Sequence, residues 1–383
     1  MREQTRVFIL HNEITPYRLP IFEQLSKRFN VHVYFCTQKS PERLWDTDIV
    51  NRYSFKWSVL PNFKIGEFVI NPTVLFEAVK DWDVYLISEG YDIGLSVILS
   101  IIGAKIKQKP IVLWTEHIDT PHSKRQESVT KRILKRIYEL LIYSQATIFV
   151  GYSKKSKLFL INRNIPSSKI IFGSQVMPFS LICRDKDKDK KSDKNLKTIK
   201  IDTSKFKRFV TYIGYFRKPK GIQLLIKAFK KITIRDTALI LAGAGPYEKE
   251  LRRIAEKDKR IFFIGYVDGQ KKSTIYSLAT VFVLPTFHDA WGLVINEALY
   301  FGVPVITTTA AGGSQIIING KNGFVVPPED ENALKRSIET LLENPKLQRK
   351  MSKIARRYGE KYTDPKVGAE PFIKALNTLV RFS

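Results

Sequence analysis

Short apolar, β-rich runs alternate with helical patterns along most of this chain, and that alternation constrains the fold more than any other feature. In the first half the runs lie at residues 7–10, 31–35, 84–88, 111–115 and 147–150, with helical patterns between them at 19–29, 73–79 and 131–143. The alternation predicts a parallel, doubly wound α/β sheet. Ligands of such sheets bind beyond the carboxyl ends of the strands.

The same alternation restarts in the second half, after a change in composition. Residues 184–205 contain many Lys and Asp side chains and no aromatic one, which is typical of an exposed loop or linker. Beyond them, β-rich runs recur at 208–213, 238–242, 261–264, 280–284, 303–307 and 323–326, with helical patterns such as 222–231 and 247–256. We therefore predict a second α/β domain.

Length, cysteine content and charge limit the class of protein. A chain of 383 residues with 44 % hydrophobic residues can fill two cores. Its two cysteines, Cys36 and Cys183, indicate neither a disulfide framework nor a cysteine metal site, and we expect a reducing, cytoplasmic setting. The net charge of +27 predicts a polyanionic neighbour: a membrane leaflet, a nucleic acid or a phosphorylated substrate.

Two segments bear on membranes and targeting. The first residues, MREQTRVFILHNE, hold only a short apolar run, so we expect no signal peptide, and the longest apolar run, residues 93–104, is too short to span a bilayer. In residues 123–144, Ile133, Ile137, Leu140 and Leu141 stand at helical spacing among basic residues. This segment is either a membrane-surface helix or an ordinary helix packed on the sheet with a solvated basic face.

Two acidic residues, Asp289 and Glu297, stand eight apart around a Trp-Gly turn. Asp289 follows an apolar strand, and we expect Glu297 to lie on a helix that Gly292 opens. A helix N-terminus offers N–H groups to an anion, and flanking carboxylates accept hydrogen bonds from vicinal hydroxyls. The combination suits a nucleotide sugar. The alternative is a turn residue at 289 and a solvated helix residue at 297.

This spacing resembles the acid, seven residues, acid motif of retaining glycosyltransferases of family 4, although the first acid of that family is usually Glu. The resemblance covers nearly the whole chain and is most specific from 214 to 323. It implies the GT-B fold, with two Rossmann-like domains, a cleft between them and a C-terminal helix returning to the first domain. The expected parts are an acceptor-binding domain at 1–183, a charged linker at 184–206, a nucleotide-sugar-binding domain at 207–358 and the returning helical segment at 359–383.

Further motifs follow in the family's order. IGYFRKPKG, residues 213–221, resembles the pattern in which a glycine, here Gly214, precedes a lysine, here Lys220, that meets the donor diphosphate. Tyr215 replaces the family's arginine. Arg217 either reaches the same phosphate or belongs to a solvated loop.

Two glycine turns complete the donor side by resemblance. LAGAGPYEKEL, residues 241–251, is similar to the family's Gly-x-Gly-Pro turn and makes Gly243 a candidate for binding; the alternative is a plain sharp turn. In the region 262–286, the resemblance puts Tyr266 and Val267 beside the nucleotide base.

The resemblance also assigns roles around the acidic pair. It implies that Glu297 binds the donor ribose and that Asp289 contacts the donor hexose. The N–H groups of Gly292, Leu293 and Val294 would face the phosphates, where a helix end contributes about 0.3–1 kcal/mol per favourable charge.

The first domain carries fewer signals. LWTEHIDTPH, residues 113–122, follows a buried-looking strand where family members often carry a cleft histidine, so His117 is our candidate for contacting the transferring sugar, with Glu116 next. A loop histidine without a role is the alternative. His288 is a further polar neighbour, and His11 either touches substrate or has a structural role.

The reaction implied by the resemblance is retaining, metal-independent hexosyl transfer from a nucleoside-diphosphate sugar to a glycan or lipid-linked acceptor, with no cofactor besides that donor. It would serve cell-surface polysaccharide or glycolipid synthesis, with peripheral attachment at an anionic inner membrane face as the hypothesis for location. The alternatives are a nucleotide-sugar epimerase of the same fold and a basic nucleic-acid-binding protein. No helix-turn-helix, zinc-finger or RNP pattern supports the latter.

Overall fold

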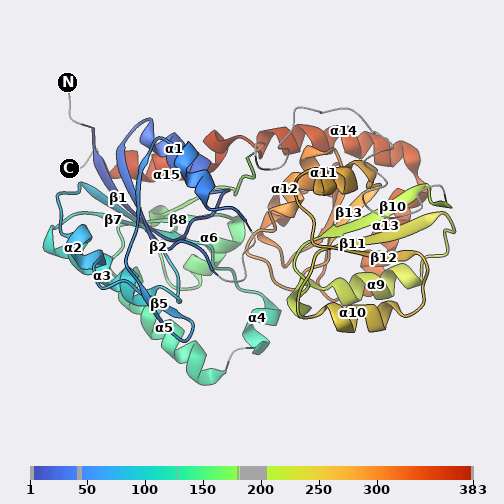
Figure 1. The fold of residues 1–383 in the computed structure, drawn as a ribbon, viewed down its shortest axis with the longest axis horizontal. Coiled ribbons are helices and arrows are strands. Elements are labelled where there is room, and N and C mark those ends of the chain that lie inside the picture. The colour runs from blue at the N-terminus through green and yellow to red at the C-terminus, as the bar shows by residue number, and fades with distance from the viewer. Residues whose placement is uncertain (1–3, 41–44, 127, 179–180, 182–204, 381–383) are drawn as a thin grey trace. The chain divides into compact units, whose positions relative to one another are not determined.

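The computed structural model describes residues 4–40, 45–126, 128–178, 181 and 205–380 (Figure 1). The predicted charged linker at 184–206 lies outside the described residues except for its last two. The chain forms two compact units. Unit 1 consists of Met1–Asp119, Gln126–Ser174 and Pro365–Ser383, and unit 2 of Thr120–Arg125 and Gln175–Asp364.

Unit 1 contains a seven-stranded parallel sheet in the order β3-β2-β1-β6-β7-β8-β9. Its strands are β1 (Arg6–Glu13), β2 (Asn30–Thr37), β3 (Lys56–Val59), β6 (Val84–Ser88), β7 (Ile111–Thr115), β8 (Ile148–Gly151) and β9 (Ile170–Phe172). A separate antiparallel hairpin pairs β4 (Phe63–Ile65) with β5 (Phe68–Ile70). The helices are α1 (Leu19–Ser26), η1 (Asp48–Arg52), α2 (Val74–Ala78), α3 (Gly94–Ile106), α5 (Val129–Tyr143), α6 (Lys154–Ile161), η2 (Ser167–Lys169) and α15 (Pro365–Val380).

The centre of this sheet follows from its sequence. Every residue of β6, β7 and β8 is buried, as expected for parallel strands covered on both faces. The five predicted strands are present, each within about two or three residues of its expected ends. The edge strands β3 and β9 were not predicted, because both are short and β3 is only partly buried. The C-terminal helix α15 packs against α1 within unit 1, and its Phe372 ring lies 4.8 Å from that of Trp114.

Unit 2 contains a six-stranded parallel sheet in the order β12-β11-β10-β13-β14-β15. Its strands are β10 (Arg208–Ile213), β11 (Thr237–Ala242), β12 (Ile261–Gly265), β13 (Val281–Leu284), β14 (Val305–Thr308) and β15 (Gly323–Val326). Its helices are α4 (Pro121–Gln126, whose last residue falls in unit 1), η4 (Lys218–Lys220), α9 (Ile222–Lys230), α10 (Glu248–Ala255), α11 (Gly269–Leu278), α12 (Val294–Tyr300), η5 (Gly312–Ile316), α13 (Glu331–Glu343) and α14 (Pro345–Lys361).

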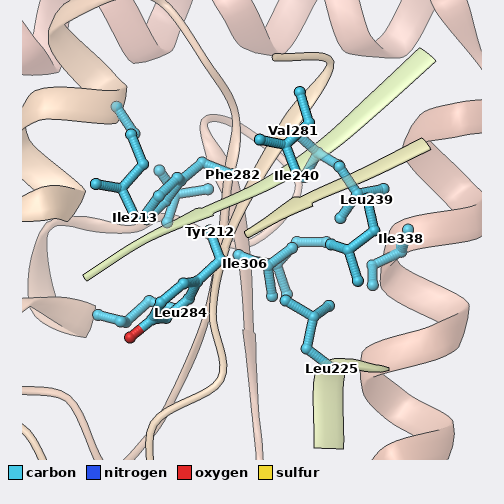
Figure 2. Close-up of a cluster of buried hydrophobic side chains, with 14 of the residues drawn as sticks. Tyr212, Ile213, Leu225, Leu239, Ile240, Val281, Phe282, Leu284, Ile306 and Ile338 are labelled. Atoms are coloured by element: carbon cyan, nitrogen blue, oxygen red, sulfur yellow. The ribbon is translucent and has the colours of Figure 1, made fainter. Parts of the chain in front are cut away.

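The core of unit 2 forms where helices cover this sheet. Figure 2 shows side chains of the central strands, such as Ile240 and Ile306, gathered with Leu225 of α9 and Ile338 of α13. All six predicted strands of this half are present, within about two residues of their expected ends. Helix α14 runs through residue 358, so the predicted domain boundary there falls inside a helix.

Side-chain caps fix several helix starts. Ser128 accepts a hydrogen bond from the Lys131 amide at the start of α5, and Asp330 accepts one from Ala333 at the start of α13. Such caps supply acceptors for amides that lack an intrahelical partner. Within the described residues, none of the helices combines the length and apolar composition needed to cross a bilayer.

Candidate functional site

The strand order of unit 2 changes direction at β10. From β10 the chain proceeds to β11 and β12 on one side, and then returns to β13 on the other side before adding β14 and β15. The loops after β10 and β13 therefore flank the crevice beyond the strand ends at which doubly wound sheets bind ligands. The predicted donor-side motifs, residues 213–221 and 289–297, are these two loops.

An ion pair joins the two loops. Lys220, at the end of η4, donates from Nζ to Asp289 Oδ2 at 2.6 Å. The loops are also held by their backbones, because the Phe287 amide donates to the Pro219 carbonyl at 2.7 Å and the Thr286 hydroxyl donates to the same oxygen at 3.1 Å. The Lys220 ammonium and the Asp289 carboxylate are therefore held together at the switch point of this sheet.

Gly221 is required by this arrangement. Its φ of 70° is left-handed, and a β-carbon on it would overlap the Pro285 carbonyl oxygen. Glycine alone combines that conformation with that close approach. The motif Lys-Gly at 220–221 thus follows from backbone geometry as well as from charge.

Helix α12 begins at Val294, so the prediction that Gly292 opens it was wrong. Gly292 has a φ of 86°, and a β-carbon on it would lie 2.6 Å from the Leu284 side chain. This left-handed residue turns the chain sharply under the end of β13, and helical geometry starts only after the turn. Leu293 is the N-cap residue, without a side-chain cap.

Glu297 lies on α12 and is almost fully buried, so the alternative of a solvated helix residue is wrong. Its Oε1 accepts a hydrogen bond from Lys272 Nζ and its Oε2 accepts one from the Tyr276 hydroxyl, both at 2.7 Å. Burial, and then the Glu297 carboxylate, raise the pKa of Tyr276 far above its ordinary value, which keeps the phenol neutral and donating.

Lys272 and Tyr276 were not identified from the sequence. They stand four residues apart on α11, and residues at that spacing share one face of a helix. That spacing was the available signal. Nothing in the sequence, however, indicates that this face of α11 lies against Glu297.

The turn between Asp289 and α12 is pinned by backbone bonds to a second turn. The Gly312 amide donates to the Asp289 carbonyl at 3.0 Å, and the Gly313 amide donates to the Trp291 carbonyl at 2.8 Å. The Trp291 indole is buried and donates to Asn296 Oδ1 at 2.8 Å. The predicted importance of the Trp-Gly turn thus has a structural basis.

The glycine turns after β10, β11 and β12 lie side by side. The Gly214 amide donates to the Ala242 carbonyl at 3.0 Å, and the Gly243 amide donates to the Gly265 carbonyl at 2.7 Å. Next in the chain, the Tyr266 side chain is half exposed and Val267 is buried.

Arg217, after β10, and His288, after β13, each contact another side chain. The Arg217 guanidinium lies over the ring of Tyr215, 4.9 Å from its centroid. His288 Nδ1, beside Asp289, lies 3.0 Å from the Thr120 hydroxyl, which also belongs to unit 2.

His117 lies in unit 1, just beyond β7. Its Nε2 is 3.1 Å from Oε1 of the fully buried Glu89, a separation that fits an ion pair although the ring nitrogen is not aligned for a hydrogen bond. Burial opposes the charged imidazole, but the carboxylates of Glu89 and Glu139 outweigh it and raise the pKa of His117. The Tyr91 ring stacks on the imidazole at 4.8 Å.

Glu116 is also in unit 1 and is held by an ion pair to Arg18. The Arg18 guanidinium is buried over the ring of Tyr152, 4.0 Å from its centroid. His11 is buried as well, with Nδ1 3.1 Å from the Glu13 carbonyl, and burial together with Arg18 lowers the pKa of His11 to about 3. Because His11 is buried and neutral, the structure supports a structural role for it and not a contact with substrate.

Among the described residues, the sequence Asp81-Trp82-Asp83 has the Asp-x-Asp pattern of some metal sites. Asp81 and Asp83 of the Asp-x-Asp sequence both pair with Arg6. In the part of the chain that the structure describes, no three His, Cys, Asp or Glu side chains form a group that could hold a metal ion.

Comparison with known proteins is consistent with the motifs. Residues 193–358 match the family model for glycosyl transferases group 1. The chain is similar to the D-rhamnosyltransferase WbpZ of Pseudomonas aeruginosa, with 30 % identity over 162 residues, 41 % of this chain and 42 % of WbpZ. It is 27 % identical over 303 residues to the capsular polysaccharide biosynthesis glycosyltransferase CapM of Staphylococcus aureus, covering 75 % of each chain.

Solved structures share the fold. A crystal structure of Anabaena Alr3699/HepE in complex with UDP-glucose aligns over 98 % of this chain and all of that one, with a TM-score of 0.75 at 16 % identity. The match thus spans less than half the length of WbpZ and three quarters of CapM, while the fold shared with HepE extends over 98 % of this chain. The match to group 1 glycosyl transferases is confined to residues 193–358, less than half of the chain.

Proposed function

We propose that this protein transfers a sugar from a nucleoside-diphosphate sugar to a glycan or lipid-linked acceptor in cell-surface polysaccharide or glycolipid synthesis. The family match, the similarity to WbpZ and CapM, and the fold shared with a UDP-glucose complex of HepE support this proposal. Residues 207–358 are the proposed nucleotide-sugar-binding part and residues 1–183 the acceptor-binding part, with 359–383 returning to the latter.

The observation that carries the proposal is the Lys220–Asp289 pair at the switch point of the unit 2 sheet. A diphosphate would compete with Asp289 for the ammonium, and a hydrogen bond to a charged group contributes about 1.5–3 kcal/mol. The exchange would leave the Asp289 carboxylate free to accept a hydrogen bond from a hydroxyl of the donor hexose. Lys220 would thereby bind the diphosphate while Asp289 binds the sugar.

Glu297 has the capacity for the proposed ribose contact. Each carboxylate oxygen can accept about two hydrogen bonds. Lys272 and Tyr276 use one position on each oxygen, which leaves acceptors for two vicinal hydroxyls. The two donors also keep the carboxylate in one orientation, so less conformational freedom is lost on binding.

The remaining donor contacts are proposed from the turns. Amides at the start of a helix lack intrahelical acceptors, and we assign to the phosphates the amide of Val294, where α12 begins, and those of Gly292 and Leu293 in the turn before it. The further proposed contacts are Gly214, Arg217, Gly243, Tyr266 and Val267. As the glycosidic bond breaks, negative charge collects on the diphosphate, and fixed N–H groups together with an ammonium would stabilise it.

Three finer features belong to the same proposal. Transfer proceeds with retention at the anomeric carbon and without a metal ion, and His117 and Glu116 contact the transferring sugar and the acceptor. The protein works at the inner face of the cell membrane. Proton NMR of the product's anomeric centre tests retention, and activity in excess chelator tests the need for a metal.

A donor screen by thermal shift tests the proposal directly, because a ligand that binds only the folded state raises the unfolding midpoint by mass action. Lys220→Met and Glu297→Gln are expected to abolish the shift. The matched control is Lys230→Met, which removes a similarly exposed lysine that pairs with Glu256 at 3.0 Å in the same unit. Unchanged donor binding in both site variants would contradict the assignment.

Product analysis separates transfer from epimerisation. Incubation of the donor with and without an acceptor is followed by chromatography of the nucleotide sugars. A glycosyltransferase releases nucleoside diphosphate and forms a longer glycan only when acceptor is present. Conversion of the donor into its epimer without acceptor would instead support the alternative enzyme.

A further inference from the structure

Exposed large apolar side chains are unevenly distributed between the two units. The described residues include 18 of them, and 16 lie in unit 1, while the other two, Tyr215 and Tyr266, lie in unit 2. Single exposed apolar residues are normal on any protein, but a cluster marks an interaction site. Unit 1 therefore carries a surface that folding alone does not explain.

Helix α5 provides six of these exposed apolar side chains. Its buried side consists of Glu139, Ile142 and Tyr143, which pack into unit 1. The opposite side exposes six aliphatic side chains by 50 % to 62 %: Val129, Ile133, Leu134, Ile137, Leu140 and Leu141. The alternative of a helix that packs these apolar residues on the sheet is therefore wrong.

Helix α3 and the β4–β5 hairpin expose apolar side chains as well. On α3, Leu95, Ile102 and Ile106 are spaced by seven and four residues and so form one stripe. In the hairpin, Phe63 and Ile65 alternate onto one face, and Phe68 stands opposite Ile65 on that same face.

These three elements meet at the start of α3. The Val69 amide of the hairpin donates to the Asp92 carbonyl at 2.8 Å, and the Tyr138 hydroxyl of α5 donates to the Gly90 carbonyl at 3.2 Å. Figure 1 labels α3, α5 and β5 in this part of unit 1. We call the twelve exposed side chains of α5, α3 and the hairpin the apolar surface.

The charges around the apolar surface have one sign on both helices. Helix α3 contains no acidic residue, and the only one on α5, Glu139, is buried and paired with Arg136 and Arg163. Exposed basic residues flank the apolar stripes: Lys105 and Lys107 at the end of α3, and Lys131 and Arg132 on α5.

This combination of chemistry selects the partner. A second copy of the chain, packed through the same surface about a two-fold axis, would bring like charges together. Nucleic acid would use the basic residues but leave the aliphatic ones in water. An anionic bilayer accepts both, since aliphatic side chains enter its interface and lysines and arginines contact its headgroups.

We propose that the apolar surface of α5, α3 and the β4–β5 hairpin docks on an anionic lipid bilayer. The docking rests on the proposed location at the inner membrane face, for which it names the surface, and it does not depend on donor binding. It explains why so many apolar side chains are exposed in one unit, and it uses part of the excess positive charge.

Flotation with lipid vesicles tests the proposal, using the full chain without any nucleotide sugar. Vesicles of phosphatidylcholine alone are compared with vesicles that also contain phosphatidylglycerol. Binding is expected mainly to the anionic vesicles and is expected to weaken with added salt. Absence of binding to the anionic vesicles would overturn the proposal whether or not the protein binds a donor.

Variants then locate the surface. The triple variant Ile133→Gln, Ile137→Gln, Leu141→Gln removes apolar area that is already solvated, so it should fold, and we expect partitioning to fall by roughly 100-fold or more. Phe63→Ser with Phe68→Ser provides an independent test in the hairpin. Vesicle binding equal to that of the wild type in both variants would refute the assignment.

The charge contribution has a matched control. Lys131→Gln with Arg132→Gln is expected to reduce binding about 30-fold, because each basic residue near an anionic surface contributes about 1 kcal/mol. Lys346→Gln with Lys350→Gln removes the same charge from exposed positions on α14 and should have little effect. Equal losses in the two pairs would show attraction by net charge alone.

Self-association is measured in parallel by sedimentation equilibrium without lipid. We expect no dimer whose formation depends on α5. A dimer that the triple variant dissociates, together with no vesicle binding by the wild type, would assign the apolar surface to a contact between copies of the chain instead.

Discussion

Replacing Glu297 with alanine should destabilise unit 2 strongly, even without any ligand. Glu297 is 2 % exposed and accepts hydrogen bonds from Lys272 and from the buried Tyr276. Alanine would leave the phenol hydroxyl with only the Val294 carbonyl, 3.5 Å away, as an acceptor, and would leave the Lys272 ammonium without its carboxylate partner. The consequence belongs to folding and is separate from any loss of donor binding.

The structure sets the size of the effect. Breaking a buried ion pair by removing one partner costs about 3–5 kcal/mol. The Lys272 side chain is 24 % exposed and can regain water, so we expect about 3 kcal/mol, the lower end. For a domain of this size that corresponds to a fall in Tm of about 6–12 °C. Glu297→Gln keeps an acceptor for Tyr276 and should cost about half as much.

Urea unfolding followed by circular dichroism measures the free energy of unfolding of each variant. The control is Glu248→Ala, which removes a carboxylate paired with Arg252 at 2.8 Å on the exposed surface of α10, and which should cost only about 0.5 kcal/mol. If Glu297→Ala unfolds at the same urea concentration as the control, the buried hydrogen bonds do not hold unit 2 together and the argument fails.

The histidines and glycines of the two units give further predictions. The pKa of His11 is about 3 in the folded protein, below its ordinary value of 6.5, so the unfolded chain binds the proton first as pH falls. The free energy of unfolding should therefore fall by about 1.4 kcal/mol per pH unit below pH 6.5. In urea unfolding, His11→Gln should flatten that slope. The pKa of His117 is raised, so its stabilising effect should be complete below pH 6.5 and lost as pH rises through the folded-state pKa; NMR titration should show a lower pKa in Glu89→Gln. In thermal unfolding, Gly320→Ala should cost about 1 kcal/mol and Gly221→Ala several times as much. Both glycines have a left-handed φ, but only Gly221 lacks room for a β-carbon.

The fold could largely be predicted from the sequence because a buried parallel strand consists of consecutive apolar residues. The strands β11 and β13 of unit 2 and the central strands β6, β7 and β8 of unit 1 have this form. The strand β3 and the two hairpin strands lack it, since they are only three or four residues long and nearly all of their side chains are exposed or half-buried. Runs that short do not distinguish a strand from a loop.

The candidate site could be predicted only in part. Lys220, Asp289 and Glu297 were found because their spacing along two loops resembles a family motif. The partners of Glu297 were not, because Lys272 and Tyr276 stand 25 and 21 residues earlier on a helix whose orientation depends on how it packs on the sheet. A contact of that kind is a property of tertiary structure, and helical spacing alone does not determine it.

Helix α5 illustrates the same limit in reverse. Its periodicity correctly indicated one apolar face, and in a globular protein such a face ordinarily packs on the sheet. In unit 1 the buried side of α5 instead contains Tyr138, Tyr143 and the Glu139 carboxylate, whose polar atoms are satisfied by Gly90, Glu89 and neighbouring arginines. Because these groups occupy most of the buried side, only one aliphatic side chain of α5, Ile142, is buried with them, and the other six are exposed. What covers those side chains is then decided by the surroundings of the protein, and an anionic bilayer is the environment that matches both their apolar area and the charges beside them.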